Sequence, residues 1–240
     1  MIEKTDNAAY SPAAGLSDRC KTIQDLPSPG ETTGFKSMAI AGRIIEILFS
    51  LILLLLFLPL MLLIAAIIRW DSPGNVIFAA PRLGLRGKEF TCYKFRSMYG
   101  SNEVPLQDYF TANPAWECEW LHYAKLKNQD PRITRSGRWL RKSSLDELPQ
   151  LINILKGDMS FIGPRPYMPR ERPTMGPYAD VILSIKPGLT GLWQVSGRSD
   201  LNFQQRLVLD NYYVKKHSIM LDIIILIKTI PAVILCKGAY

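Results

Sequence analysis

The chain has 240 residues, which is enough for one catalytic domain and an anchor but tight for two full globular domains. Hydrophobic residues make up 48% of it and the formal net charge is +8, a combination suited to an anionic membrane surface and to phosphate-bearing substrates. Nucleic acid would explain the charge but not the long apolar block, so we expect no nucleic-acid partner.

The cysteines and histidines exclude several kinds of chemistry. The four cysteines lie far apart, with no CxxC or Cys/His cluster, which predicts neither a zinc site nor a disulfide framework and is typical of reduced thiols in the cytoplasm. Only His122 and His217 are present, and neither stands in a nucleophile motif. The chemistry is therefore expected from carboxylates and cations.

The N-terminal third predicts a tail followed by a membrane helix. Residues 1–36 mix polar, proline and glycine residues without periodicity, which is typical of a disordered cytoplasmic tail. Residues 37–70 contain 22 uncharged residues between Glu46 and Arg69. A straight helix of that length extends roughly 33 Å, close to the thickness of a bilayer core.

Pro59 stands near the centre of this apolar run and predicts a kink or a break, because proline removes a backbone hydrogen bond. Two topologies remain open at this point. The segment either spans the bilayer, or it bends at Pro59 and returns, and positive charge on both flanks favours the return.

Residues 71–240 predict the catalytic domain. Two short strands, at 76–80 and 90–98, flank a turn at 83–88, and Lys94 and Arg96 fall on one face of the second strand. Two adjacent cations repel unless an anion lies between them, although a solvated strand face is the alternative. Residues 106–127 and 219–235 predict amphipathic helices at the membrane interface.

Residues 141–157 carry the most informative pattern. Their leucines and isoleucines repeat with helical spacing and Gly157 supplies a stop, which places Asp146 and Glu147 at the start of the helix. A purely structural interpretation is available, because Ser144 and Glu147 have the spacing of a capping box. Five cations precede or adjoin the carboxylates, more than capping needs: Arg132, Arg135, Arg138, Arg141 and Lys142.

A carboxylate near cations stays ionised and can attack phosphorus, while its neighbour holds magnesium. Asp146 and Glu147 are the candidates for these two tasks. Arg165, fixed between Pro164 and Pro166, presents a guanidinium to phosphate or to a uracil edge, and Arg198 ends a glycine-rich loop.

Together these segments resemble the bacterial sugar transferase family, the small monotopic phosphoglycosyl transferases that act on polyprenyl phosphate. The resemblance runs from about Gly42 to the C-terminus and rests on five motifs in order: TyrLysPheArgSerMet, SerLeuAspGluLeuProGlnLeu, LysGlyAspMetSerPheIleGlyProArgPro, ProGlyLeuThrGlyLeuTrpGlnValSerGlyArg and LeuAspAsnTyrTyrVal. Within the family, the closing residues look like those of galactosyl-1-phosphate transferases that initiate exopolysaccharides.

The resemblance implies a helix-rich α/β fold of the α+β kind. It also implies that Asp146 is the nucleophile toward a UDP-sugar, that Glu147 (with Asp146) binds Mg²⁺, and that polyprenyl phosphate collects the phosphosugar. The expected ligands of phosphate or nucleotide are Arg141, Arg165 and Arg198, with Lys94 and Arg96 lining the site. The implied acceptor is undecaprenyl phosphate, and the implied product begins an exopolysaccharide.

The family's membrane helix is re-entrant and broken at a Ser-Pro pair, whereas this chain has Leu58 before Pro59. Re-entry places the catalytic domain on the cytoplasmic face of the inner membrane, in contact with lipid; a homodimer is left open. Two alternatives also stay open. One is a membrane-tethered binding module in which the carboxylates only cap a helix, and the other is direct transfer with Asp146 as base or metal ligand.

Overall fold

A computed structural model describes residues 35–100, 110–111, 130–197 and 201–234. The predicted tail lies almost wholly outside these residues, and so does most of the predicted helix at 106–127. Arg198, His122 and three of the four cysteines also lie outside them. The described part is rich in helices, with two small two-stranded sheets, which confirms the helix-rich class with few strands.

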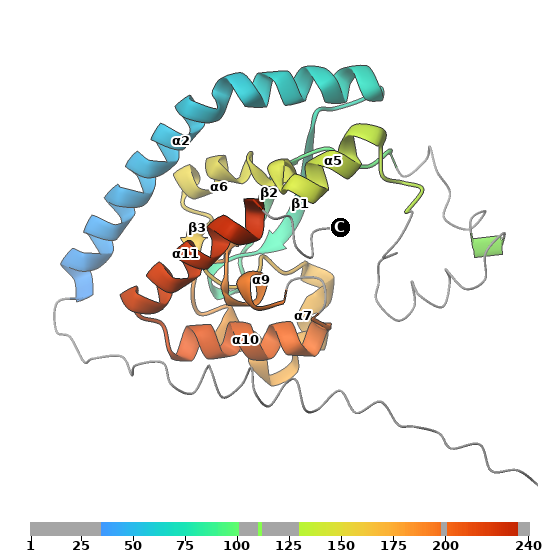
Figure 1. Ribbon diagram of the computed structural model, residues 1–240. Helices are drawn as coiled ribbons and strands as arrows, with labels where there is room; N and C mark the ends of the chain where they lie inside the picture. Colours follow the sequence, from blue (N-terminus) through green and yellow to red (C-terminus); the bar gives the residue numbers. More distant parts are fainter. Residues whose placement is uncertain (1–34, 101–109, 112–129, 198–200, 235–240) are drawn as a thin grey trace, which may run out of the picture. The chain divides into compact units, whose positions relative to one another are not determined.

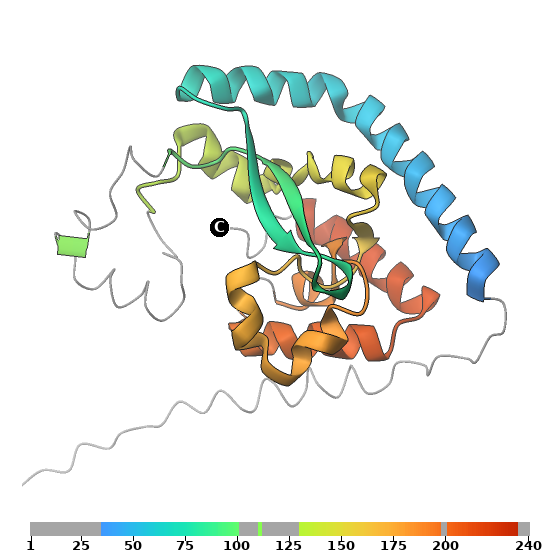
Figure 2. The ribbon, with the colours of Figure 1, turned by 180° about the vertical axis from the view of Figure 1, so that it is seen from behind.

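The predicted membrane helix is the long helix α2, Phe35–Asp71, which contains Pro59. The axis of α2 bends in the middle in both views (Figures 1 and 2). Pro59 lies inside the helix and does not end it, and proline is a common cause of such a bend. Residues 42–71 are long and apolar enough to cross a membrane, and few of them are buried by the protein. Many of their leucines and isoleucines are exposed, such as Leu55 and Leu56.

The two predicted strands form an antiparallel hairpin, β1 (Ile77–Leu83) and β2 (Glu89–Phe95). A 3₁₀ turn, η1 (Leu85–Gly87), connects them, and Arg86 and Gly87 take positive φ there. Arg96 follows the end of β2, and its side chain turns away from the hairpin to the C-terminal end of α2.

The helix predicted to start at or near Asp146 and Glu147 begins at Gln150, and three elements lie within residues 135–156. Helix α5 (Arg135–Ser143) ends at Ser144, which is left-handed with φ 58°; the 3₁₀ turn η2 (Leu145–Glu147) follows; and α6 (Gln150–Lys156) ends at Gly157, with φ 89°. The predicted stop at Gly157 is confirmed. The capping box of the alternative, purely structural interpretation is not formed, because Ser144 ends α5 and its side chain makes no capping hydrogen bond to η2.

The C-terminal half is built from short elements around a parallel strand pair, β3 (Ser160–Ile162) and β4 (Gly188–Thr190). Longer helices close the domain, α10 (Phe203–Lys215) and α11 (Ile219–Ile234). The short elements are η3 (Pro169–Glu171), α7 (Arg172–Met175), η4 (Gly176–Tyr178), α8 (Ala179–Ile182) and α9 (Leu192–Ser196).

Three buried clusters hold these elements together, and α2 takes part in two of them. Ile64 and Ile68 of α2 pack with Phe95 and Leu140, while Leu54 of α2 packs against a cluster around α6. A third cluster joins α8 and α10 to the loop before η3. Helix α11 buries Leu221 and Ile225 and exposes an apolar stripe; a helix in this region is confirmed, and its membrane contact stays a prediction. The stripe consists of Ile219, Met220, Ile223, Leu226, Ile227 and Ile230.

Candidate active site

The two adjacent carboxylates lie in the 3₁₀ turn η2, between the C-terminal end of α5 and the start of α6. Asp146 is 9% exposed, whereas the side chain of Glu147 is 31% exposed. A buried carboxylate beside an accessible one suits two different tasks, one at a reacting atom and one facing solvent or a bound ion.

Lys94 of β2 pairs with this turn. Its Nζ donates to Glu147 Oε1 at 2.6 Å, which brings the hairpin and η2 together. Burial alone would lower the pKa of Lys94, but Glu147 and Asp146 outweigh it and the pKa is raised. Lys94 is therefore a fixed positive charge at the carboxylates.

Asp146 has an unusual acidity. Burial, and then the negative charge of Glu147, raise its pKa to about 6, against the opposing effect of Lys94 and Arg141. Desolvation outweighs the nearby cations, so the pKa of Asp146 is raised and not lowered. At neutral pH the carboxylate is still mostly ionised, as a nucleophile requires, but it is less well solvated than an exposed aspartate.

The same pair of carboxylates fits a magnesium ion. Their mutual repulsion contributes to the raised pKa of Asp146, and a divalent cation would relieve it. Among the residues that the structure describes, no group of three or more histidine, cysteine or acidic residues could hold a metal. Mg²⁺ commonly needs only one or two carboxylates, with substrate phosphates and water completing its shell.

The predicted cationic neighbourhood is only partly assembled at the carboxylates. Arg141 lies close enough to lower the pKa of Asp146, whereas Arg132 pairs with Asp130 at 2.7 Å. Arg96 donates to Ser72 O at 2.7 Å, to Ser72 Oγ at 2.8 Å and to the Pro73 carbonyl. Arg96 thus holds the turn that follows α2, and none of these three bonds involves the carboxylates.

A second cationic group surrounds Trp193 of α9. The guanidinium of Arg165 lies 5.6 Å from the centre of the indole ring and that of Arg206 lies 5.0 Å from it. These two charges are close enough that Arg165 lowers the pKa of Arg206, after burial, its largest cause. Two guanidinium groups on one indole favour an anionic ligand.

Asp210 of α10 holds this group in place from within the core. Its Oδ2 accepts the backbone N–H of Arg165 at 3.1 Å and the hydroxyl of Tyr167 at 2.8 Å. Burial raises the pKa of Asp210 to about 7. Sequence analysis quoted the LeuAspAsnTyrTyrVal motif but gave Asp210 no task, and it missed Arg206, which stands in no motif.

Comparison with known proteins defines the class. Residues 37–236 match the family model of the bacterial sugar transferases, and the chain belongs to this family. The enzymes of this family are sugar transferases, which agrees with a carboxylate pair placed among cations.

Individual relatives point the same way. The chain is 43% identical to the exopolysaccharide production protein ExoY of Rhizobium meliloti and 41% identical to ExoY of Sinorhizobium fredii, in each case over 88% of this chain and 94% of the relative. It is 44% identical to the undecaprenyl-phosphate galactose phosphotransferase of Salmonella typhimurium, over 85% of this chain and 43% of that longer protein.

Proposed function

We propose that the protein transfers a hexose 1-phosphate, galactose or glucose 1-phosphate, from a UDP-sugar to undecaprenyl phosphate. The products are undecaprenyl-diphosphate-sugar and UMP, and the reaction is the first membrane step of exopolysaccharide biosynthesis. Relatives named as galactose and glucose phosphotransferases of undecaprenyl phosphate support this donor and acceptor. The observation that carries the proposal is the buried, poorly solvated Asp146 beside Glu147 and Lys94.

The transfer takes place in two displacements at one phosphorus atom. A carboxylate oxygen of Asp146 attacks the phosphorus that bears the sugar; the bond to the bridging oxygen breaks, and UMP leaves with that electron pair. A phosphate oxygen of undecaprenyl phosphate then attacks the same phosphorus and displaces the Asp146 carboxylate. No net proton is consumed, so the buried carboxylate returns to its starting state.

The residues around Asp146 have supporting roles. Lys94 keeps a positive charge beside the attacked phosphoryl group, and Arg141 adds a second one. Glu147 and Asp146 would hold Mg²⁺, which when bound neutralises negative charge on the diphosphate. Glu147 is the more accessible of the two and is the stronger candidate for the metal.

We assign the nucleotide to the second cationic group, around Trp193. Arg165 and Arg206 offer guanidinium forks to a phosphate or to a uracil edge, and the buried indole of Trp193 helps to hold both guanidinium groups in place. Arg96 would reach substrate only if it left the end of α2, and Arg198 lies outside the described residues.

The contacts of α2 support re-entry over a spanning helix. Ahead of Pro59, α2 donates from Arg43 to the last turn of α6 and packs against the α6 cluster through Leu54; after Pro59, it packs against α5 and β2 through Ile68. Contact of both parts with one catalytic domain supports re-entry, because the far end of a spanning helix would lie about 30 Å away across the bilayer core. We propose a monotopic protein whose catalytic domain faces the cytoplasm at the inner membrane.

The proposal is tested by offering UDP-galactose, UDP-glucose and other UDP-sugars with undecaprenyl phosphate and Mg²⁺ and identifying the lipid product. Asp146→Asn should abolish UMP release while membrane association persists. The matched control is Asp180→Asn, because Asp180 is an exposed aspartate of α8. Wild-type turnover by Asp146→Asn would refute the nucleophile; a membrane-tethered binding module would show no turnover in any variant.

A further inference from the structure

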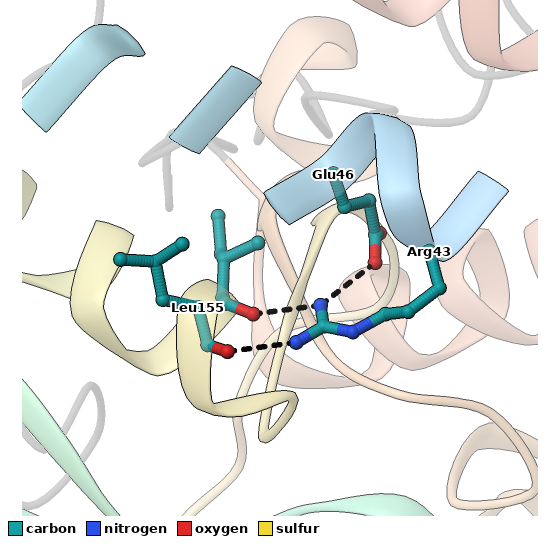
Figure 3. Close-up of polar contacts among 4 residues, drawn as sticks. Arg43, Glu46 and Leu155 are labelled. Carbon is teal, nitrogen blue, oxygen red and sulfur yellow. Dashed lines mark hydrogen bonds and ion pairs between the residues drawn. The ribbon is translucent and has the colours of Figure 1, made fainter. Parts of the chain in front are cut away.

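The membrane helix α2 is hydrogen-bonded to both ends of the segment that carries the carboxylates, α5–η2–α6. At the C-terminal end of that segment, Arg43 Nη1 donates to Ile154 O at 2.7 Å and Nη2 donates to Leu155 O at 2.8 Å (Figure 3). These carbonyls belong to the last turn of α6, where backbone acceptors lack α-helical partners, although Ile154 O also accepts the N–H of Gly157 at 3.0 Å. Arg43 therefore caps α6 from the membrane helix.

Further contacts of the Arg43 guanidinium fix its orientation. Glu46 Oε2 lies 3.2 Å from Arg43 Nη1 on the neighbouring turn of α2, so the guanidinium is held between an acidic side chain and two carbonyls (Figure 3). It also covers Gly157, where a Cβ atom would lie 3.2 Å from Arg43 Nη2. The fork matches two carbonyls at once, which a lysine ammonium does less well.

At the N-terminal end of that segment, Asp71 of α2 makes the second contact. Its Oδ2 accepts the backbone N–H of Ser136 at 2.8 Å and the hydroxyl of Ser136 at 2.7 Å. Ser136 lies in the first turn of α5, whose amide groups also lack helical partners. One membrane helix thus satisfies the first turn of α5 and the last turn of α6.

Only short links join the two anchored helices to the turn that carries the carboxylates. Ser144 alone separates α5 from η2, and Leu148 and Pro149 separate η2 from α6. A shift of either helix is therefore transmitted to Asp146. On a straight helix Arg43 and Asp71 would lie roughly 42 Å apart, whereas a continuous helix from Ser136 to Leu155 would extend only roughly 29 Å. The bend of α2 lessens this mismatch.

We infer that Arg43 is a positioning residue for the transfer reaction, acting through α6 on the turn that carries Asp146 and Glu147. The bend of the membrane helix then sets the placement of the carboxylates. This inference rests on the proposed function only for its kinetic consequences. Its structural consequence, a more mobile η2 when Arg43 is changed, can be measured without any turnover.

The test compares Arg43→Met and Arg43→Lys with Arg69→Met in vesicles of phosphatidylethanolamine and phosphatidylglycerol. Arg69 is the matched control, since it is an arginine of the same helix whose hydrogen bond to Gly74 O at 3.5 Å does not involve α5 or α6. Hydrogen exchange of the backbone amides at 145–148 should accelerate in Arg43→Met and not in Arg69→Met. Acceleration confined to 154–158 would reduce Arg43 to a local helix cap and overturn the inference.

The kinetic readout uses the same vesicles with UDP-galactose or UDP-glucose and undecaprenyl phosphate. Arg43→Met should lower kcat about 10- to 100-fold, with KM for the donor within about twofold, because a misplaced nucleophile loses rate more than affinity. Arg43→Lys should lie between. The inference is overturned if the kcat of Arg43→Met equals that of Arg69→Met. It is also overturned if the kcat of Arg43→Lys equals that of the wild type. Absence of turnover in the wild type would instead reject the proposed function and leave the exchange test standing.

Discussion

Replacing Asp146 by asparagine should make the protein more stable at neutral pH while removing its activity. Burial and Glu147 raise the pKa of this carboxyl from 3.8 to about 6, so the folded protein binds its proton more tightly than the unfolded chain does. Between pH 3.8 and about pH 6 the free energy of unfolding therefore falls as the pH rises. Above about pH 6 the full cost of burying ionised Asp146 remains. At 1.36 kcal/mol per pKa unit, the cost of ionised Asp146 at pH 7 is about 3 kcal/mol as an upper limit.

The assay is the free energy of unfolding of the metal-free protein without donor or acceptor, followed by tryptophan fluorescence between pH 4 and pH 8. The advantage of Asp146→Asn over the wild type should be near zero at pH 4 and should grow to about 2–3 kcal/mol at pH 7. Asp180→Asn, which changes an exposed aspartate, should show no such trend. An advantage that is the same at every pH, or a loss at pH 7, would refute the assigned ionisation.

Three further results are expected. The pH profile of kcat/KM should have an acid limb near pH 6, the apparent pKa of the coupled carboxylates, and a limb near pH 4 would contradict a buried nucleophile. Lys94→Met should move that limb to higher pH, because Lys94 lowers the pKa of Asp146, whereas Lys156→Met, at an exposed lysine bonded to Tyr93, should leave it in place. Asp210→Ala should lower the free energy of unfolding by about 2 kcal/mol, because the backbone N–H of Arg165 loses its acceptor. The same loss should raise KM for the UDP-sugar. An unchanged KM would show that Asp210 has no role in donor binding.

Local signals predicted the elements that position the site. The turn residues at 83–88 marked the hairpin that carries Lys94, and Gly157 marked the end of α6, since both positions need backbone conformations that few residues supply. The apolar run predicted α2. A serine three residues before Glu147 suits a capping box, but the left-handed backbone of Ser144 ends α5 instead, which the spacing alone does not show.

Long-range contacts could not be predicted in this way. Nothing in the spacing of Lys94 and Arg96 shows that Lys94 reaches Glu147 while Arg96 reaches the end of α2. The pairing of Arg43 with α6 joins residues that are far apart in the chain, and it depends on the bend of α2. The acidity of Asp146 likewise depends on burial, which is a property of the folded protein.

The most direct measurement of the central claim is the mass of the protein after incubation with UDP-sugar and Mg²⁺ in the absence of lipid acceptor. The account predicts an added phosphohexose that peptide mapping places on Asp146, that disappears when undecaprenyl phosphate is supplied, and that is absent from Asp146→Asn. An enzyme that turns over donor and acceptor together, yet carries no added mass on Asp146 when the acceptor is withheld, would contradict the covalent route and favour direct transfer.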